Sequence, residues 1–147
     1  MRKTCNGSIA LEIEWNNKDP FFDRDLDNFQ RLHGEGAISV GVIVTRGSSL
    51  QENMIQIVTG CAIRCNIQKF EDVETEYGVT PTPRQRNLVK SEGDNFAKEW
   101  AKRFVQDKFG QATTHWNKLQ ARISRGVGNP CPLLLIGIPV TVVYHKD

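Results

Sequence analysis

Ile9-Ala10-Leu11-Glu12-Ile13-Glu14-Trp15 is a stretch in which every second side chain is large and apolar. This period of two predicts a β-strand with one apolar face. The other face carries Glu12 and Glu14, roughly 7 Å apart along a strand. Strands disfavour glutamate, and two carboxylates this close repel each other unless a cation or water intervenes. The pattern alone leaves two interpretations open, a cation site and an edge strand with two solvated glutamates.

The residues that follow the strand favour the cation site. Asn16-Asn17-Lys18-Asp19 brings two amides and an ammonium group next to the carboxylates. Carboxylate oxygens suit a hard divalent cation, and such an ion lowers the pKa of a bound water and neutralises a phosphate. The combination is typical of phosphodiester hydrolysis. A solvated turn is the alternative for Asn17 and Lys18.

Helical spacing begins at Pro20, which suits the first position of a helix. Apolar side chains recur through residues 22–32, and Gly34 and Gly36 end the pattern. Further along, residues 46–51 are expected to be a loop, and 54–58 fit a strand or a short helix. The polar stretch 66–90 is expected to be mobile, with regular structure interrupted at Thr80-Pro81-Thr82-Pro83. The elements predicted with a clear pattern are strands at about 9–15, 37–45 and 132–143 and helices at about 20–34, 94–109 and 114–124.

Strand, helix and strand follow one another in this order, which favours a sheet with a crossover connection. The prediction is an α/β fold with a mixed central β-sheet flanked by helices. The strand at 37–45 is expected to be covered on both faces, and the one at 132–143 to be buried except at Pro139. Arg122 and Arg125 are expected on a solvated helix surface.

Length and composition predict a single domain over residues 1–147. The net charge of +2 is too small to indicate nucleic-acid binding by itself, so a DNA footprint has to be a local patch. No apolar run reaches transmembrane length, and no apolar core follows the basic start as in a signal peptide. The expected location is the cytoplasm, with no membrane partner.

Four cysteines are scattered along the chain, at positions 5, 61, 65 and 131. This usage agrees with a reducing compartment. Cys61 and Cys65 are four residues apart, but zinc needs two more ligands at a suitable spacing. We therefore expect small buried side chains at these positions rather than a zinc site.

Two blocks of sequence carry a resemblance to a known family. The first is Glu12-Ile13-Glu14-Trp15-Asn16-Asn17-Lys18-Asp19, continued by Asp23-Arg24-Asp25-Leu26. The second is Thr113-Thr114-His115-Trp116-Asn117-Lys118-Leu119, followed by an apolar segment from Cys131 to Ile138. Both resemble the type II restriction endonucleases of the BglII/BstYI group, from about residue 9 to about residue 140. The resemblance implies a PD-(D/E)xK nuclease with a restriction-endonuclease-like fold.

The resemblance also implies roles for individual residues. Glu12 would be the magnesium-binding carboxylate, Ile13 would supply a backbone carbonyl to Mg²⁺, and Glu14 would help orient the attacking water. The segment of Thr113, Thr114 and His115 would face DNA, where short hydroxyls and a histidine can hydrogen-bond base edges. The sequence by itself favours a helix cap for these three residues instead.

DNA contacts are also expected outside the second block. Asn17 and Lys18 would meet a phosphate or a base. Arg46, at the end of the strand at 37–45, is a candidate for a backbone phosphate.

The expected function is magnesium-dependent cleavage of double-stranded DNA at a short palindromic site, by a homodimer with one active site per strand. The family's other metal-binding Asp is expected nine residues before Glu12, where this chain has Lys3. Family members also carry an N-terminal helical region. The chain is therefore expected to be the C-terminal catalytic part of a longer member. The alternatives are a truncated, catalytically inactive remnant that folds and binds DNA without cutting, and a structural domain with two surface glutamates.

Overall fold

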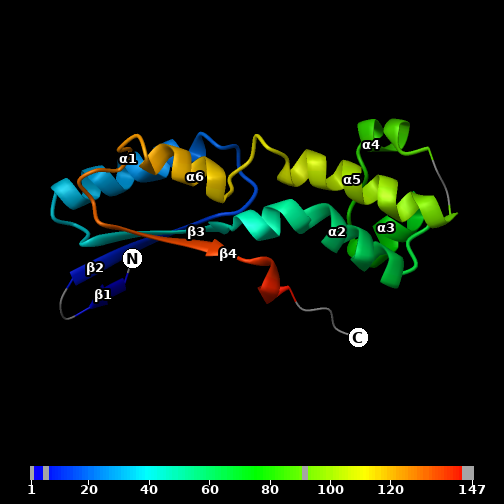
Figure 1. Cartoon of the computed structure of the whole chain (residues 1–147), viewed down its shortest axis with the longest axis horizontal. Helices are drawn as coiled ribbons and strands as arrows, with labels where there is room; N and C mark the ends of the chain where they lie inside the picture. Colours follow the sequence, from blue (N-terminus) through cyan, green and yellow to red (C-terminus); the bar gives the residue numbers. More distant parts are fainter. Residues whose placement is uncertain (1, 5–6, 91–92, 144–147) are drawn as a thin grey trace. The chain divides into compact units, whose positions relative to one another are not determined.

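A computed structural model of the chain describes residues 2–4, 7–90 and 93–143 (Figure 1). Its contacts divide the chain into two compact units. We call the first, built on residues 1–51 and 111–143, the sheet unit, and the second, built on residues 52–110, the helical unit. The single domain predicted from length and composition stays a prediction beside this division. None of the helices in the described residues has the length and apolar character to span a bilayer.

The sheet unit contains a four-stranded sheet in the order β1-β2-β3-β4. The first pair is antiparallel, and the other two are parallel. Helices α1 and α6 belong to the same unit, so the predicted α/β fold with a mixed sheet flanked by helices is confirmed. The elements are β1 (Arg2–Thr4), β2 (Gly7–Glu14), α1 (Phe21–Gly34), β3 (Val40–Arg46), α6 (Trp116–Ile123), β4 (Leu133–Ile138) and the 3-10 turn η2 (Val140–Val142).

Helices α1 and α6 lie on the same side of the sheet (Figure 1). The core between them and the sheet is apolar, and its buried members are Phe22, Leu26, Phe29, Ile38, Ile43, Leu119 and Cys131. In the register of β2 and β3, Glu12 lies opposite Ile43 and Glu14 opposite Thr45. Because side chains alternate along a strand, both glutamates project from the helix-covered face of the sheet.

The other face of the sheet is exposed on β2 and β4, contrary to part of the prediction, whereas Val42 of β3 is buried there. Leu11 and Ile13 of β2 are 55% and 64% exposed, and Leu134 of β4 is 53% exposed. The expected burial of the strand at 132–143 is therefore wrong on this face. The reason is that α1 and α6 both pack on the glutamate-bearing face, a choice that the apolar pattern of the strands does not reveal.

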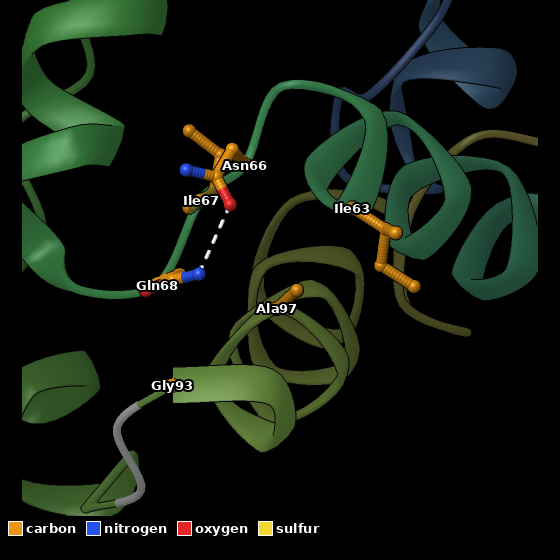
Figure 2. A pocket seen from close by; sticks show the side chains of 6 residues that line it. All are labelled: Ile63, Asn66, Ile67, Gln68, Gly93 and Ala97. Carbon is orange, nitrogen blue, oxygen red and sulfur yellow. Dashed lines mark hydrogen bonds between the residues drawn. The ribbon is translucent and has the colours of Figure 1, made fainter.

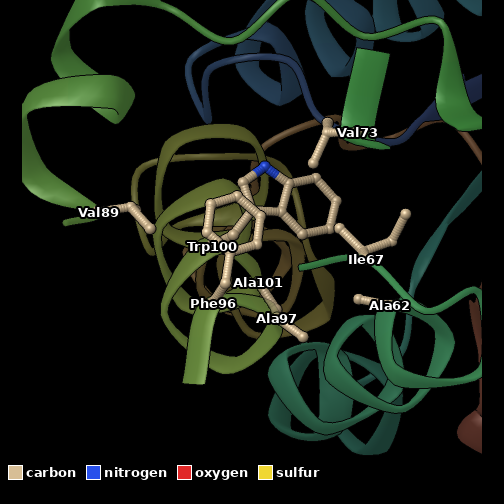
Figure 3. Packing of buried hydrophobic residues seen from close by; sticks show 8 residues of the cluster. All are labelled: Ala62, Ile67, Val73, Val89, Phe96, Ala97, Trp100 and Ala101. Carbon is tan, nitrogen blue, oxygen red and sulfur yellow. The ribbon is translucent and has the colours of Figure 1, made fainter. Parts of the chain in front are cut away.

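The helical unit contains four helices and one 3-10 turn in its described residues: α2 (Ser48–Arg64), whose first turn belongs to the sheet unit, α3 (Phe70–Tyr77), α4 (Pro83–Leu88), η1 (Gly93–Asn95) and α5 (Phe96–Phe109). Figure 3 shows its core, in which Trp100 lies among Phe96, Val73 and Ile67. The Trp100 ring also stacks on Tyr77, with 5.8 Å between centroids.

One expectation for this part of the chain is wrong. Residues 46–51 are not a loop throughout, because α2 begins at Ser48. The stretch 66–90 contains α3 and α4, although its composition is polar. Thr82 explains the start of α4, since its hydroxyl accepts a hydrogen bond from Gln85 N (3.2 Å) and its own N–H donates to Gln85 Oε1 (2.9 Å). Packing on the Trp100 core then stabilises helices too short to persist alone.

Substitution of Gly41 by alanine is expected to destabilise the sheet unit. A Cβ atom at this position of β3 would lie 2.4 Å from Cδ2 of Phe29, which is buried in α1. Overpacking of this kind costs about 1–3 kcal/mol in the free energy of unfolding. Urea unfolding measures the change. The matched control is Gly34→Ala, where no atom lies within 4 Å of the new methyl group, and equal stability of the two variants would contradict the prediction.

Candidate functional site

The carboxyl ends of β2, β3 and β4 meet at one edge of the sheet because these strands are parallel. Helix α1 begins just beyond the end of β2, and α2 begins just beyond the end of β3. The start of α6 lies at the same edge, since Ser48 Oγ donates to Asn117 Oδ1 (2.8 Å). Helix N-termini attract anions, and α/β sheets bind ligands outside this edge. This edge is therefore suited to an anionic substrate.

The structure brings the two sequence blocks together at this edge. Lys18 and Thr113 form an isolated antiparallel bridge. The N–H of Thr114 donates to the carbonyl of Asn17 (2.8 Å), and the N–H of Asp19 donates to the carbonyl of Ala112 (3.0 Å). Residues about a hundred positions apart in the chain thus form one surface next to the end of β2.

Glu12 and Glu14 differ in their surroundings. Glu12 is half-buried, whereas Glu14 is only 2% exposed. Asn17 Nδ2 donates to Glu14 Oε2 over 3.0 Å. Burial raises the pKa of Glu14 above its usual value, Asp25 adds to the rise, and the Asn17 amide opposes it. Of the two carboxylates, Glu12 is therefore the one that is more accessible to solvent.

Asp25 and Arg24 are neighbours of Glu14 that the sequence analysis did not select. Asp25 is 1% exposed, and its Oδ1 accepts hydrogen bonds from Arg24 Nε (2.9 Å) and Nη2 (2.7 Å). Its Oδ2 is buried and has no hydrogen-bond partner in the described part of the chain. Arg24 Nη2 also lies 3.5 Å from Glu14 Oε1. The sequence did contain a signal for Asp25, because this acidic residue falls at helical spacing within the apolar stripe that α1 buries.

Arg46 is buried, with no exposed surface. Its guanidinium donates to the carbonyls of Trp15 (2.7 Å) and Thr114 (2.6 Å), to Thr113 Oγ1 (2.7 Å) and to Gln51 Oε1. The side chain therefore joins the end of β2, the start of α2 and the second sequence block. Contact of Arg46 with a phosphate stays a prediction that this placement does not support.

The second block is mostly internal. Thr114 and His115 are 0% and 1% exposed, while Thr113 is half-buried. His115 occupies the N-cap position of α6 but makes no side-chain capping bond. Asn17 and Lys18 are exposed. The residues of the predicted DNA surface that reach solvent are thus Asn17, Lys18 and part of Thr113.

A group of ion pairs joins α1 to α6 beside this surface. Arg122 Nε lies 2.9 Å from Asp23 Oδ1, and Arg122 Nη2 lies 3.7 Å from Asp19 Oδ2. Lys118 Nζ is 3.4 Å from the same Asp19 oxygen. The expected solvated position of Arg122 is wrong, because this side chain packs between the two helices and is only 7% exposed.

Stability is expected to fall as the pH drops below the usual histidine pKa of 6.5 because of His115. Burial lowers the pKa of His115, and the charges of Arg46 and Lys118 lower it further. The unfolded chain then binds a proton more readily than the folded one, so acid favours unfolding. Urea unfolding of the wild type and His115→Gln at pH values above and below 6.5 tests this. An identical pH dependence in both proteins would contradict it.

The oxygen donors at this edge fit magnesium. Among the described residues, no three His, Cys, Asp or Glu side chains are close enough to enclose a metal ion. Magnesium does not require such a cage, since it keeps several waters and binds through one or two carboxylates. Half-buried Glu12 and the buried, unpartnered Oδ2 of Asp25 are oxygens of the kind it prefers.

The helical unit has a cavity of about 190 Å³. Figure 2 shows that its lining includes two polar side chains, Asn66 and Gln68, which point toward each other. Gln68 Nε2 donates to Asn66 Oδ1 over 3.0 Å. The other lining residues are Ile63, Ile67, Gly93 and Ala97. Because this lining contains no acid, base or nucleophile, this cavity offers no candidate catalytic group.

Comparison with known proteins gives one family. The model of a family described as restriction endonuclease BglII/BglIII matches residues 3–138. No match is found among the curated proteins or among the solved structures. The matched range includes both sequence blocks and every strand from β2 to β4.

Proposed function

Because the chain belongs to the BglII/BglIII restriction endonuclease family, a family of DNA-cleaving nucleases, we propose that it cuts double-stranded DNA at a short palindromic site in a magnesium-dependent reaction. The family predicted from the two sequence blocks is thereby confirmed. The observation that carries the proposal is the meeting of both blocks with the paired glutamates at the carboxyl edge of the sheet.

In the proposed reaction, a water attacks the phosphorus in line and the bond to the leaving oxygen breaks. Glu12 and the carbonyl of Ile13 would hold Mg²⁺, which when bound supplies Lewis acidity and a more acidic water. Glu14 accepts a hydrogen bond from the attacking water and orients it. Its own orientation is fixed by the Asn17 amide.

DNA binding is assigned to the exposed part of the same edge. Lys18 and Asn17 contact a phosphate, and Thr113 lies beside them through its bridge with Lys18. Thr114, His115 and Arg46 support this surface from behind, since all three are buried. A palindromic site is cut on both strands by a two-fold homodimer that supplies one site per strand.

Cleavage of unmethylated plasmid by the purified chain tests the proposal. Discrete bands are expected with magnesium, and no cleavage is expected with a chelator. A chain that binds plasmid in a gel-shift assay but yields no bands would instead support the alternative, an inactive remnant. The feature that favours the alternative is Lys3, which pairs with Ser8 in the β1–β2 hairpin at the place expected for an acidic residue.

A further inference from the structure

Glu14 and Asp25 form a pair of buried carboxyl groups that the proposed reaction uses only in part. They come from different elements, β2 and α1, and are 2% and 1% exposed. The two carboxyl groups are close neighbours, because one nitrogen of Arg24 lies 2.7 Å from Asp25 Oδ1 and 3.5 Å from Glu14 Oε1. Two carboxylates this close and this buried do not both stay ionised without a positive charge beside them. The pair therefore needs a cation or a proton.

Arg24 supplies the positive charge in this structure. Its guanidinium donates twice to Asp25 and lies 3.5 Å from Glu14 Oε1. Asp25, Glu14 and Glu12 all raise the pKa of Arg24, with the Asp25 hydrogen bond as the largest cause. The guanidinium thus lies beside the Asp25 and Glu14 carboxylates, at a position that suits a cation.

Arg24 can leave this position more easily than the carboxylates can. Its side chain is 53% exposed and rests on the ring of exposed Phe21, 4.4 Å from the centroid. Arg24 can therefore rotate into solvent without disturbing the packing of the core, whereas the two buried carboxylates that it leaves then require another positive charge. The rotation leaves both carboxylates without their guanidinium, and Oδ2 of Asp25 has no hydrogen-bond donor in the described residues.

We propose that Glu14 and Asp25 bind a divalent cation of the magnesium type, and that the guanidinium of Arg24 occupies the cation's place in the metal-free protein. Two carboxylates completed by waters are a sufficient ligand set for such an ion. This inference deepens the proposed function and rests on it, because it adds Asp25 and Arg24 to the cation site at the end of β2. Arg24 then acts as a competitor of the metal.

Binding of Mn²⁺ to the DNA-free protein, followed by the EPR signal of the free ion, tests the inference without any need for cleavage. Arg24→Gln is expected to bind Mn²⁺ about tenfold more tightly, and Asp25→Asn about tenfold or more weakly, in the range of other changes around metal ligands. The matched control is Asp27→Asn, an exposed carboxylate on the same helix, which should bind Mn²⁺ like the wild type. Glu12→Gln is measured in parallel.

Unchanged or weaker binding by Arg24→Gln would overturn the inference, as would wild-type affinity in a folded Asp25→Asn. If Asp25→Asn does not fold, Arg24→Gln alone decides, because its side chain is half-exposed. Weaker binding by Glu12→Gln alone, with wild-type affinity in both other variants, would support the proposed function and refute the role of Asp25. Wild-type affinity in Glu12→Gln, with the expected changes in Arg24→Gln and Asp25→Asn, would support this inference and refute the assignment of Glu12.

Discussion

Glu12→Gln is expected to lower the rate of magnesium-dependent DNA cleavage by about 10³-fold, because a bound ion contributes several kcal/mol to the stability of the transition state. The substitution keeps the size of the side chain and removes its negative charge. Glu12 is half-buried at the sheet edge, so a loss of fold is not expected. The measurement is kcat/KM on plasmid DNA at increasing magnesium concentration.

The control for this prediction is Glu76→Gln. Glu76 is an exposed glutamate on α3 in the helical unit, and its substitution should leave cleavage unchanged. Magnesium-dependent cleavage by Glu12→Gln at the wild-type rate would contradict the assignment of Glu12. It would also favour the interpretation of the chain as a structural domain whose glutamates have no catalytic role.

The arrangement of the sheet unit could be predicted from local patterns. Alternation with a period of two marks β2 as a strand, and the stripe of Phe22, Leu26 and Phe29 marks α1 as a helix that buries one face. Asp25 could have been found in the same way. It falls at helical spacing from Phe22 and Phe29, and an acidic residue within a buried stripe requires a partner.

Which face of the sheet the helices would cover could not be predicted from sequence. Both faces of β4 are apolar, so nothing local distinguishes exposed Leu134 from half-buried Leu135. In β2 the apolar face is the exposed one, and the face with Glu12 and Glu14 is covered. Alternation predicts that the two faces of a strand differ in polarity. The placement of α1 and α6 decides which face of the sheet is buried.

Helix α3 was missed for a related reason. Glu71, Asp72, Glu74 and Glu76 dominate its composition, and the apolar side chain that anchors it is Val73, with 0% exposure. Eight residues do not form a stable helix by themselves. The contacts that stabilise it, such as the edge-on packing of Phe70 on Phe96, join residues far apart in the chain and leave no local pattern.

Arg46→Met is expected to lower the free energy of unfolding by about 3–5 kcal/mol, since each buried group left without its hydrogen bond costs about 1–3 kcal/mol. The acceptors that lose their donor include the carbonyls of Trp15 and Thr114 and the hydroxyl of Thr113. Burial lowers the pKa of Arg46 to about 10, so the guanidinium is still charged at neutral pH. Methionine has a similar length but cannot donate to any of these oxygens.

Urea unfolding of the DNA-free protein measures the effect, and Arg31→Met is the matched control. Arg31 is an exposed arginine of α1 that pairs with Glu35 over 3.7 Å, and its loss should change stability by no more than about 0.5 kcal/mol. The comparison separates the two roles considered for Arg46. If Arg46 holds β2, α2 and the second sequence block together, Arg46→Met is less stable than the wild type without DNA. If Arg46 instead contacts a phosphate, the substitution weakens DNA binding and leaves the unfolding curve unchanged.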